Sequence, residues 1–396
     1  MRTHRQLFTE LLGQTSPEPL SLEVEYARGV YMYTPEGDNV IDIISGVSAS
    51  NLGHSHPKIV AAVKEQAEKY MHLMVYGEII QSPQVQLAKL VLSLLPESLS
   101  SLFLVNSGSE AVEGALKLAK RVTGRPKIIS THNAYHGSTH GALSVLGNDY
   151  FKDNYQPLLP DVHFIHYNNE KDLQEIDKNT ACVIIEPIQS EAGIIIGETS
   201  YLKALRKKCT ETGTLLIFDE VQNGFGRTGK MFGYQHSGVI PDIICFAKGL
   251  GGGMPIGAFA ASKEHMNSFT NNPVLGHITT FGGHPVSSAA ALACVRELVE
   301  NGELIKTIAQ KENLFRELLL SHPKVKSIRG KGLFLAVELD SKESVVTFIK
   351  TALKHGVLTD YFLFCETHFR IAPPLIITEE EIKEASTRIH KALDEL

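Results

Sequence analysis

The alternation of helix-like and strand-like hydrophobic patterns constrains the fold of this chain more than any other feature. From about residue 57, segments with helical periodicity alternate with short apolar runs rich in β-branched residues. Such runs between helices are typical of buried parallel strands. The pattern therefore predicts an open α/β sheet with helices on both faces. The runs are residues 101–105, 127–130, 162–167, 181–188, 215–220 and 243–248.

The chain is expected to have three parts. Residues 1–45 form an N-terminal arm followed by a hairpin that turns at the sequence PEGD. Residues 46–294 contain the sheet and form a large ligand-binding domain. Beyond them the pattern changes to a long helix near 302–321, three strand-like runs and a last helix near 378–394. Residues 295–396 are therefore predicted to form a smaller α+β domain.

Charge and cysteine patterns exclude several classes of protein. The net charge is −6 and the charges are interspersed without a basic stripe, which gives no indication of a nucleic-acid partner. No stretch reaches the roughly 18–20 apolar residues of a membrane span, and the first residues lack the apolar run of a signal peptide. The five scattered cysteines form no CxxC pair or zinc spacing, which favours a reducing compartment. We expect a cytoplasmic protein without a membrane partner.

Lys248 is the first candidate functional residue. Ligands of open α/β sheets bind beyond the carboxyl ends of the strands, and Lys248 ends the apolar run IICFA, before a glycine-rich loop. Partial desolvation there favours the neutral amine, which suits nucleophilic Schiff-base chemistry. The alternative is a lysine that extends into solvent from a strand end.

Asp219 ends another run, LLIFD, that is expected to be central in the sheet. A carboxylate there costs free energy unless it meets a cation or strong hydrogen-bond donors. A pyridinium nitrogen is such a cation, and an aspartate beside it keeps the ring protonated as an electron sink. The alternative is an aspartate that caps the following turn.

The sequence Ser107-Gly108-Ser109 lies between a predicted strand and the amphipathic helix EAVEGALKLAKR. Small residues at a helix N-terminus present N–H groups and hydroxyls to an anion, and the helix dipole assists. An ordinary N-cap at Ser109 explains the same pattern.

Tyr135 and His136 follow the strand at 127–130, where an aromatic ring can stack on a planar cofactor. His132, His136 and His140 have the spacing of ligands on one helix face. Gly137 interrupts that helix and no acidic residue is nearby, so a metal site is not expected.

The glycine-rich run from Gly224 to Lys230 resembles two nucleotide-binding motifs. A P-loop needs Ser or Thr after its lysine, and Met231 stands there. A dinucleotide fingerprint follows its strand directly, whereas DEVQN intervenes here. Both interpretations fail.

Together these segments resemble the class III (ω) aminotransferases, which depend on pyridoxal 5′-phosphate (PLP) and have fold type I. The resemblance covers residues from about 20 to the C-terminus. The motifs that carry it are NSGSEAVEGALKLAK, YHG, IIEPIQSEAGI, IFDEVQNGFGRTGKMF, FAKGLGGGMPIGA, TTFGGHP and RIAPPL. It implies a large domain with a mostly parallel seven-stranded sheet flanked by helices, a smaller α+β domain, and a homodimer with shared active sites.

The resemblance also implies roles at the cofactor. Lys248 would hold PLP as an internal aldimine and move the proton of the reaction, and Asp219 would pair with the pyridinium. Thr280 would complete the phosphate site across the dimer interface. The other implied cofactor-binding positions are Ser107, Gly108, Ser109, Tyr135, His136, Glu186, Val221 and Gln222.

Glu191 and Arg370 match the family pair that lets one pocket serve two substrates in a ping-pong reaction. The arginine would bind the α-carboxylate of 2-oxoglutarate or glutamate, and the glutamate would mask it when an amine donor binds.

Two departures from the family bear on the donor. Several members that accept a distal carboxylate carry arginine after YHG, where this chain has Ser138, and ornithine enzymes carry tyrosine where it has Val47. A serine offers one neutral hydrogen bond in place of a charged fork, and Val47 leaves a more apolar wall. Both departures favour a diamine donor. Two segments that are most similar to putrescine enzymes favour it as well, NPVLGHITTFGG and HGSTHGALS. His284 replaces the usual asparagine of GGNP without a physical account of its effect.

Other donors and chemistries stay open. Ornithine, N-acetylornithine and 4-aminobutyrate are alternative donors. Racemases, decarboxylases and mutases use the same fold, which does not separate them. A non-catalytic scaffold would lack Lys248, Asp219 or Arg370, and all three are present.

Overall fold

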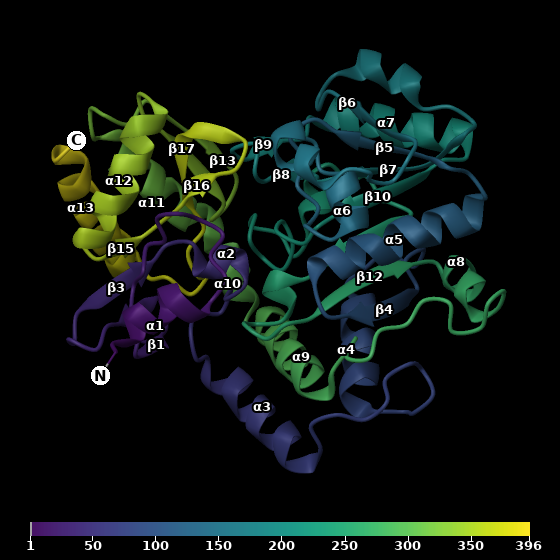
Figure 1. Ribbon diagram of the computed structural model, residues 1–396, viewed down its shortest axis with the longest axis horizontal. Coiled ribbons are helices and arrows are strands. Elements are labelled where there is room, and N and C mark those ends of the chain that lie inside the picture. Colours follow the sequence, from purple (N-terminus) through teal and green to yellow (C-terminus); the bar gives the residue numbers. More distant parts are fainter. Residues whose placement is uncertain (1) are drawn as a thin grey trace.

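A seven-stranded sheet forms the centre of the computed structural model, which describes residues 2–396 (Figure 1). Its strand order is β4-β12-β11-β10-β7-β5-β6. All of the runs predicted as parallel strands belong to it, which confirms the predicted large sheet. The strands are β4 (Ser101–Val105), β5 (Lys127–Thr131), β6 (Val162–Ile165), β7 (Thr180–Ile185), β10 (Leu215–Asp219), β11 (Ile243–Phe246) and β12 (Gly257–Ala261).

Strand β12 is the member that the hydrophobic runs did not predict. It pairs antiparallel with both β11 and β4, whereas β6, β5, β7, β10 and β11 run parallel. Its sequence GAFAA has no β-branched residue, so it lacks the composition that marks a strand. Phe259 of this strand packs against Gly114 of the following layer, where a Cβ would clash with its ring.

Helices cover both faces of the sheet because alternate residues of each strand point to opposite sides. In β10, Leu216 and Phe218 pack in the core beneath α7 (Thr199–Thr212), and Ile217 packs in the core beneath α5 (Gly108–Thr123). No helix in residues 2–396 is both long and apolar enough to cross a bilayer. The other helices of this part of the chain are α3 (Pro57–Lys69), α4 (Ser82–Ser93), α6 (His140–Ser144), α8 (Lys263–Asn267) and α9 (Pro285–Glu300).

The predicted N-terminal hairpin is present and is extended by the C-terminal part of the chain. It follows α1 (His4–Leu11). Its four-stranded sheet has the order β1-β2-β3-β15, in which β15 pairs parallel with β3, as the neighbouring labels in Figure 1 show. The strands are β1 (Tyr26–Arg28), β2 (Tyr31–Tyr33), β3 (Asn39–Asp42) and β15 (Val357–Leu358).

A second four-stranded sheet follows the large one, with the antiparallel order β13-β14-β17-β16. The predicted helix over 302–321 is wrong in one respect, because it breaks at Thr307 into α10 and α11. The domain boundary predicted after residue 294 falls within α9 and stays a prediction. The elements are α10 (Gly302–Lys306), α11 (Ile308–Leu320), β13 (Ser327–Gly330), β14 (Leu335–Glu338), α12 (Lys342–Lys354), β16 (Tyr361–Phe362), β17 (Cys365–Ile371) and α13 (Glu379–Asp394).

Short elements connect these layers. Segment α2 (Ser45–Ser48) is a left-handed turn, since Gly46 and Val47 have positive φ and ψ. Strands β8 (Ile188–Gln189) and β9 (Ile195–Ile196) form a small hairpin. The 3₁₀ turns are η1 (Asp149–Phe151), η2 (Asp153–Tyr155), η3 (Glu170–Glu175), η4 (Gly233–His236), η5 (Lys248–Leu250) and η6 (Ser268–Thr270).

The glycine-rich run at Gly224–Lys230 fixes a buried arginine. Arg227 is 0% exposed. A loop bent by the positive φ of Gly226 and Gly229 surrounds it. Its guanidinium donates to oxygens of distant segments, so the motif serves internal packing and burial lowers the pKa of Arg227 to about 9. The acceptors are Ser45 Oγ, Asn51 Oδ1, Leu333 O and Pro373 O.

Candidate active site

A cavity of about 750 Å³ opens at the carboxyl ends of the central strands. Its size is within the range of small-molecule sites, about 300–1,000 Å³. All of the predicted site residues except Ser138 and Thr280 line it. These are Val47, Ser107, Gly108, Ser109, Tyr135, His136, Glu186, Glu191, Asp219, Val221, Gln222, Lys248 and Arg370.

Lys248 begins the 3₁₀ turn η5, directly after β11, and lines the cavity. Burial lowers the pKa of its ammonium, which favours the neutral amine that a nucleophile requires. Its φ of 46° is unusual for a residue with a side chain. Such strain is found at functional sites, where the surrounding structure maintains it.

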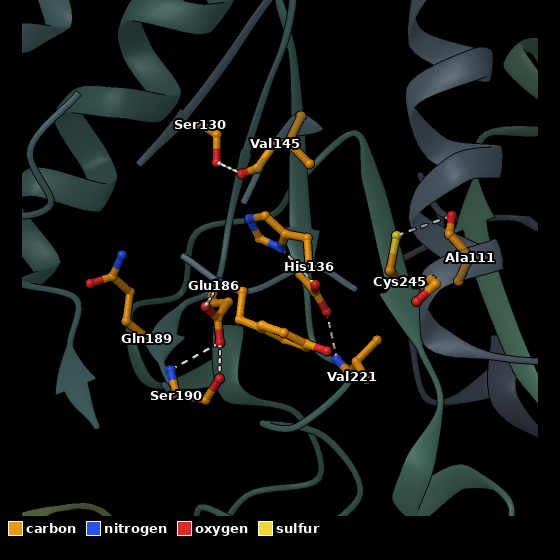
Figure 2. Close-up of polar contacts among 12 residues, drawn as sticks. Ala111, Ser130, His136, Val145, Glu186, Gln189, Ser190, Val221 and Cys245 are labelled. Atoms are coloured by element: carbon orange, nitrogen blue, oxygen red, sulfur yellow. Dashed lines mark hydrogen bonds and ion pairs between the residues drawn. The ribbon is translucent and has the colours of Figure 1, made fainter. Parts of the chain in front are cut away.

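Asp219 is 3% exposed at the end of β10, and its two oxygens have different partners. Oδ2 lies 2.8 Å from Nδ1 of His136, and Oδ1 accepts the N–H of Val221 at 2.9 Å (Figure 2). The turn-capping interpretation is therefore correct for one oxygen. The other holds a histidine inside the cavity wall, a contact that no local pattern in the sequence indicates.

Glu186 follows β7, and its carboxylate accepts hydrogen bonds from the segments that contain Tyr135 and Ser190. It accepts the N–H of Tyr135 at 3.2 Å and the N–H of Ser190 at 2.9 Å, as well as the Ser190 hydroxyl (Figure 2). Burial raises the pKa of this carboxyl to about 7. Its contacts orient the backbone that carries Tyr135.

The predicted anion site lies at the N-terminus of α5. The N-cap is Ser107 rather than Ser109, because the Ser107 hydroxyl accepts the N–H of Glu110 at 3.2 Å. Gly108 and Ser109 form the first helical positions, where free N–H groups and the helix dipole favour an anion.

Several observations show that these residues fit PLP. Gln222 Nε2 and His136 Nε2 are buried polar atoms without a hydrogen-bond partner in the described chain, so both are free to bind a ligand. A Cβ on Gly108 would lie 2.9 Å from Val221 Cγ1, so the anion-binding turn and Val221 approach as closely as glycine permits. The N-terminus of α5, a buried carboxylate and an amine therefore share one cavity.

Arg370 on β17 forms the far wall of the cavity with two carboxylates. Its Nη2 donates to both oxygens of Glu191, at 2.8 and 2.9 Å, and Asp360 Oδ1 lies 3.0 Å from its Nε. The arginine side chain is 2% exposed. Sequence reasoning missed Asp360, which belongs to no motif and meets Arg370 only through the pairing of β16 with β17.

The remaining predicted residues lie around the cavity. Val47 lines it at φ 59°, in the left-handed turn α2. Ser138 lies outside the lining, with its hydroxyl 3.1 Å from the hydroxyl of Tyr135. Thr280 is solvent-exposed and also lies outside it, and His284 stacks on His72 at 5.5 Å. The roles expected of these residues stay predictions.

Comparisons with known proteins agree with this geometry. Residues 13–393 match the family model described as aminotransferase class III. An acetylornithine aminotransferase of Methanopyrus kandleri is 38% identical over 92% of each chain. A [LysW]-aminoadipate semialdehyde/glutamate semialdehyde transaminase of Sulfolobus acidocaldarius is 35% identical over 94% of this chain and 95% of that one.

Solved structures show the same fold. An ornithine aminotransferase of Toxoplasma gondii superposes with a TM-score of 0.91 at 29% identity, over 100% of this chain and 96% of the other. An ω-transaminase of Pseudomonas jessenii also gives 0.91, at 26% identity, over 100% and 98% of the two chains. With a family match over nearly its whole length and a cavity that fits PLP, this chain belongs to the class III aminotransferases, which are PLP-dependent enzymes of fold type I.

Proposed function

We propose that this enzyme moves the terminal amino group of an amine or ω-amino acid donor to a 2-oxo acid, with 2-oxoglutarate as the acceptor, in a ping-pong reaction. The observation that carries the proposal is the Glu191–Arg370 pair, which lines the same cavity as Lys248. An arginine fork suits a carboxylate, and its pairing with a carboxylate from another segment gives the pocket a second state.

The protein residues divide the chemistry. Bound PLP supplies an electron sink that lowers the barrier to removing a proton from the amine-bearing carbon. Lys248 would hold the cofactor through its amine, and the same amine would then take and return that proton. Asp219, fixed by His136 and the Val221 N–H, would present its negative charge to the ring nitrogen. Val221 and Tyr135 would hold the two faces of the cofactor ring, and Gln222 Nε2, which has no partner within the described chain, would donate to it.

Arg370 gives the pocket its two specificities. With Glu191 on Nη2, the guanidinium is neutralised and an amine donor meets no free cation there. When Glu191 turns away, the fork is free to bind the α-carboxylate of the 2-oxo acid. Retention of both states in one cavity favours a two-substrate transamination over racemisation, decarboxylation or a mutase reaction.

The wall of the pocket favours a donor without a carboxylate, such as putrescine or another diamine. Among the described residues of one chain that line the cavity, the lysines and arginines are Lys248, where burial favours the neutral amine, and Arg370, which is already paired. Ser138 offers a hydroxyl, already shared with Tyr135, where related enzymes for acidic donors offer a fork.

The named relatives support a second donor, N-acetylornithine, more strongly than they support a diamine. Acetylornithine aminotransferases of three organisms are 38–39% identical to this chain over 92–93% of its length. The comparisons therefore favour N-acetylornithine, which from the sequence alone was only an alternative donor. The residues of the cavity favour a diamine.

Substitution of Ser138 by arginine separates the two donors. If the natural donor lacks a carboxylate, Ser138→Arg raises kcat/KM for N-acetylornithine by about 10- to 100-fold, because a charged hydrogen bond contributes roughly 1.5–3 kcal/mol. The kcat/KM for putrescine falls in the same variant. Steady-state kinetics with both donors measure the ratio, and Ser138→Ala is the control for loss of the hydroxyl. A wild-type enzyme that already prefers N-acetylornithine, and gains nothing from arginine, would contradict the diamine proposal.

A homodimer is part of the proposal. Thr280 is exposed in a single chain, in a region with exposed apolar side chains that include Val274 and Phe281. Ile80 is 93% exposed and Met71 is 66% exposed. Apolar side chains of this size at a surface indicate an interaction site, and a second copy would cover them and bring Thr280 to the phosphate site.

The cytoplasmic location stays a prediction.

A further inference from the structure

Two carboxylates lie beside Arg370, although one is enough to neutralise its positive charge. Glu191 occupies Nη2 with both oxygens, and Asp360 Oδ1 lies 3.0 Å from Nε. The contact with Asp360 is an ion pair without good hydrogen-bond angles, so its charge rather than its direction dominates. The three side chains together have a net charge of −1 when both carboxyls are ionised.

The two carboxylates are held differently. Glu191 lies in the turn between β8 and β9 and also accepts the N–H of Leu363 at 3.1 Å. Asp360 precedes β16, and the backbone N–H of Arg370 donates to its carbonyl at 2.9 Å. Asp360 is therefore tied to the arginine's own sheet. It stays beside the guanidinium when Glu191 turns away.

This arrangement has a consequence for the acceptor. After Glu191 leaves, the arginine is still neutralised at Nε, so an incoming carboxylate meets a weaker attraction than a free guanidinium offers. Arg370 Nη1 is buried and has no hydrogen-bond partner within the described chain, which leaves a donor for that carboxylate. A cationic substrate binds more tightly, because the negative charge of Asp360 attracts it.

We propose that Asp360 is a specificity-determining residue of this pocket, a second counter-ion of Arg370 that weakens the binding of carboxylate substrates and strengthens the binding of cationic ones. The inference rests on the proposed function, because it assumes that Arg370 receives the carboxylate of the acceptor. It concerns a residue with which no motif of the chain is associated.

Protonation of Asp360 would relieve this effect. Burial raises the pKa of its carboxyl to about 6, and its charged neighbours are Arg370 on β17, Glu191 of the β8–β9 turn and Asp42 on β3. A proton taken up below that pH neutralises Asp360 and leaves the guanidinium with more of its charge. Carboxylate binding therefore strengthens as the pH falls through about 6.

The test uses the PLP-loaded enzyme and glutarate, a dicarboxylate that lacks the reacting carbonyl. Asp360→Asn keeps the size of the side chain and removes its charge. We expect it to bind glutarate roughly 5- to 50-fold more tightly than wild type by calorimetry at pH 8, and to need more putrescine for half-maximal bleaching of the cofactor band. The ratio of the two glutarate affinities should approach one as the pH falls to about 5.5, because wild-type Asp360 is then protonated.

Two controls make the result decisive. Asp340→Asn removes a surface carboxylate that pairs with Lys326 at 2.7 Å, and it should change neither affinity. In an Arg370→Ala background, Asp360→Asn should no longer strengthen glutarate binding, because the effect acts through the guanidinium.

Each other outcome overturns the inference. Equal changes for glutarate and putrescine would indicate a structural role, and no change at pH 8 would show that Asp360 does not act on the pocket. An enzyme that turns over no 2-oxo acid and binds no glutarate in either form would instead refute the proposed function, and the inference with it. Turnover of 2-oxoglutarate by both forms with unchanged glutarate affinity refutes the inference alone.

Discussion

Lys248→Ala should reduce transamination by about 10⁴-fold or more, since in the proposed mechanism it removes both the covalent attachment of the cofactor and the group that moves the proton. Proton transfer by a positioned side chain alone contributes typically 10²–10⁴-fold. Lys248 lines the cavity at the end of β11, and burial lowers the pKa of its amine, which prepares it for both tasks. Single-turnover kinetics with a saturating amine donor measure the loss.

A lysine outside the cavity provides the control for Lys248→Ala. Lys230 donates to the Gln235 carbonyl in the same chain and does not line the cavity. Lys230→Ala should therefore retain activity within a few-fold of wild type. Borohydride reduction should fix the cofactor to wild type and to this control, and not to Lys248→Ala. Activity of the Lys248 variant within tenfold of wild type would refute its assigned role.

The second large effect is expected for Asp219→Asn, which keeps the shape of the side chain and removes its charge. Oδ1 would still accept the Val221 N–H, so the turn after β10 should keep its shape. Loss of a preorganised charge in an active site typically costs about 10²- to 10³-fold in rate. We expect a kcat reduced by that factor and weaker binding of PLP.

Thermal unfolding of the cofactor-free protein separates this effect from damage to the fold. The melting temperature of Asp219→Asn should stay close to wild type, because asparagine keeps the volume of the side chain and can still accept the Val221 N–H. A variant with normal kcat, or one that loses activity only because it unfolds, would contradict the proposed pairing of Asp219 with the cofactor ring.

The large sheet could be predicted because its central strands are buried on both faces. Such strands need continuous apolar, β-branched runs, and β7 and β10 have them. Strand β12 could not be found in this way, because its sequence GAFAA contains no β-branched residue. The break at Thr307 also has no proline or glycine to mark it.

The candidate site was predictable where chemistry follows directly from position along a strand. Lys248 and Asp219 end apolar runs, and a charged residue in that place needs a partner or a ligand. The contacts of Asp219 with His136, and of Arg370 with Asp360, depend on how separate segments pair in space. Periodicity carries no information about such pairs, and Asp360 has no motif, so only the structure reveals it.

The central claim is a two-step transfer through Lys248, and the visible absorbance of the PLP-loaded enzyme tests it most directly. Putrescine, ornithine, N-acetylornithine and 4-aminobutyrate are added in separate runs without a 2-oxo acid, and 2-oxoglutarate is added afterwards. Our account predicts that at least one donor, putrescine by the residues of the cavity or N-acetylornithine by the named relatives, bleaches the band to the pyridoxamine form. It also predicts that 2-oxoglutarate restores the band. A yellow enzyme that none of these amines bleaches, or a bleached one that no 2-oxo acid restores, would contradict it.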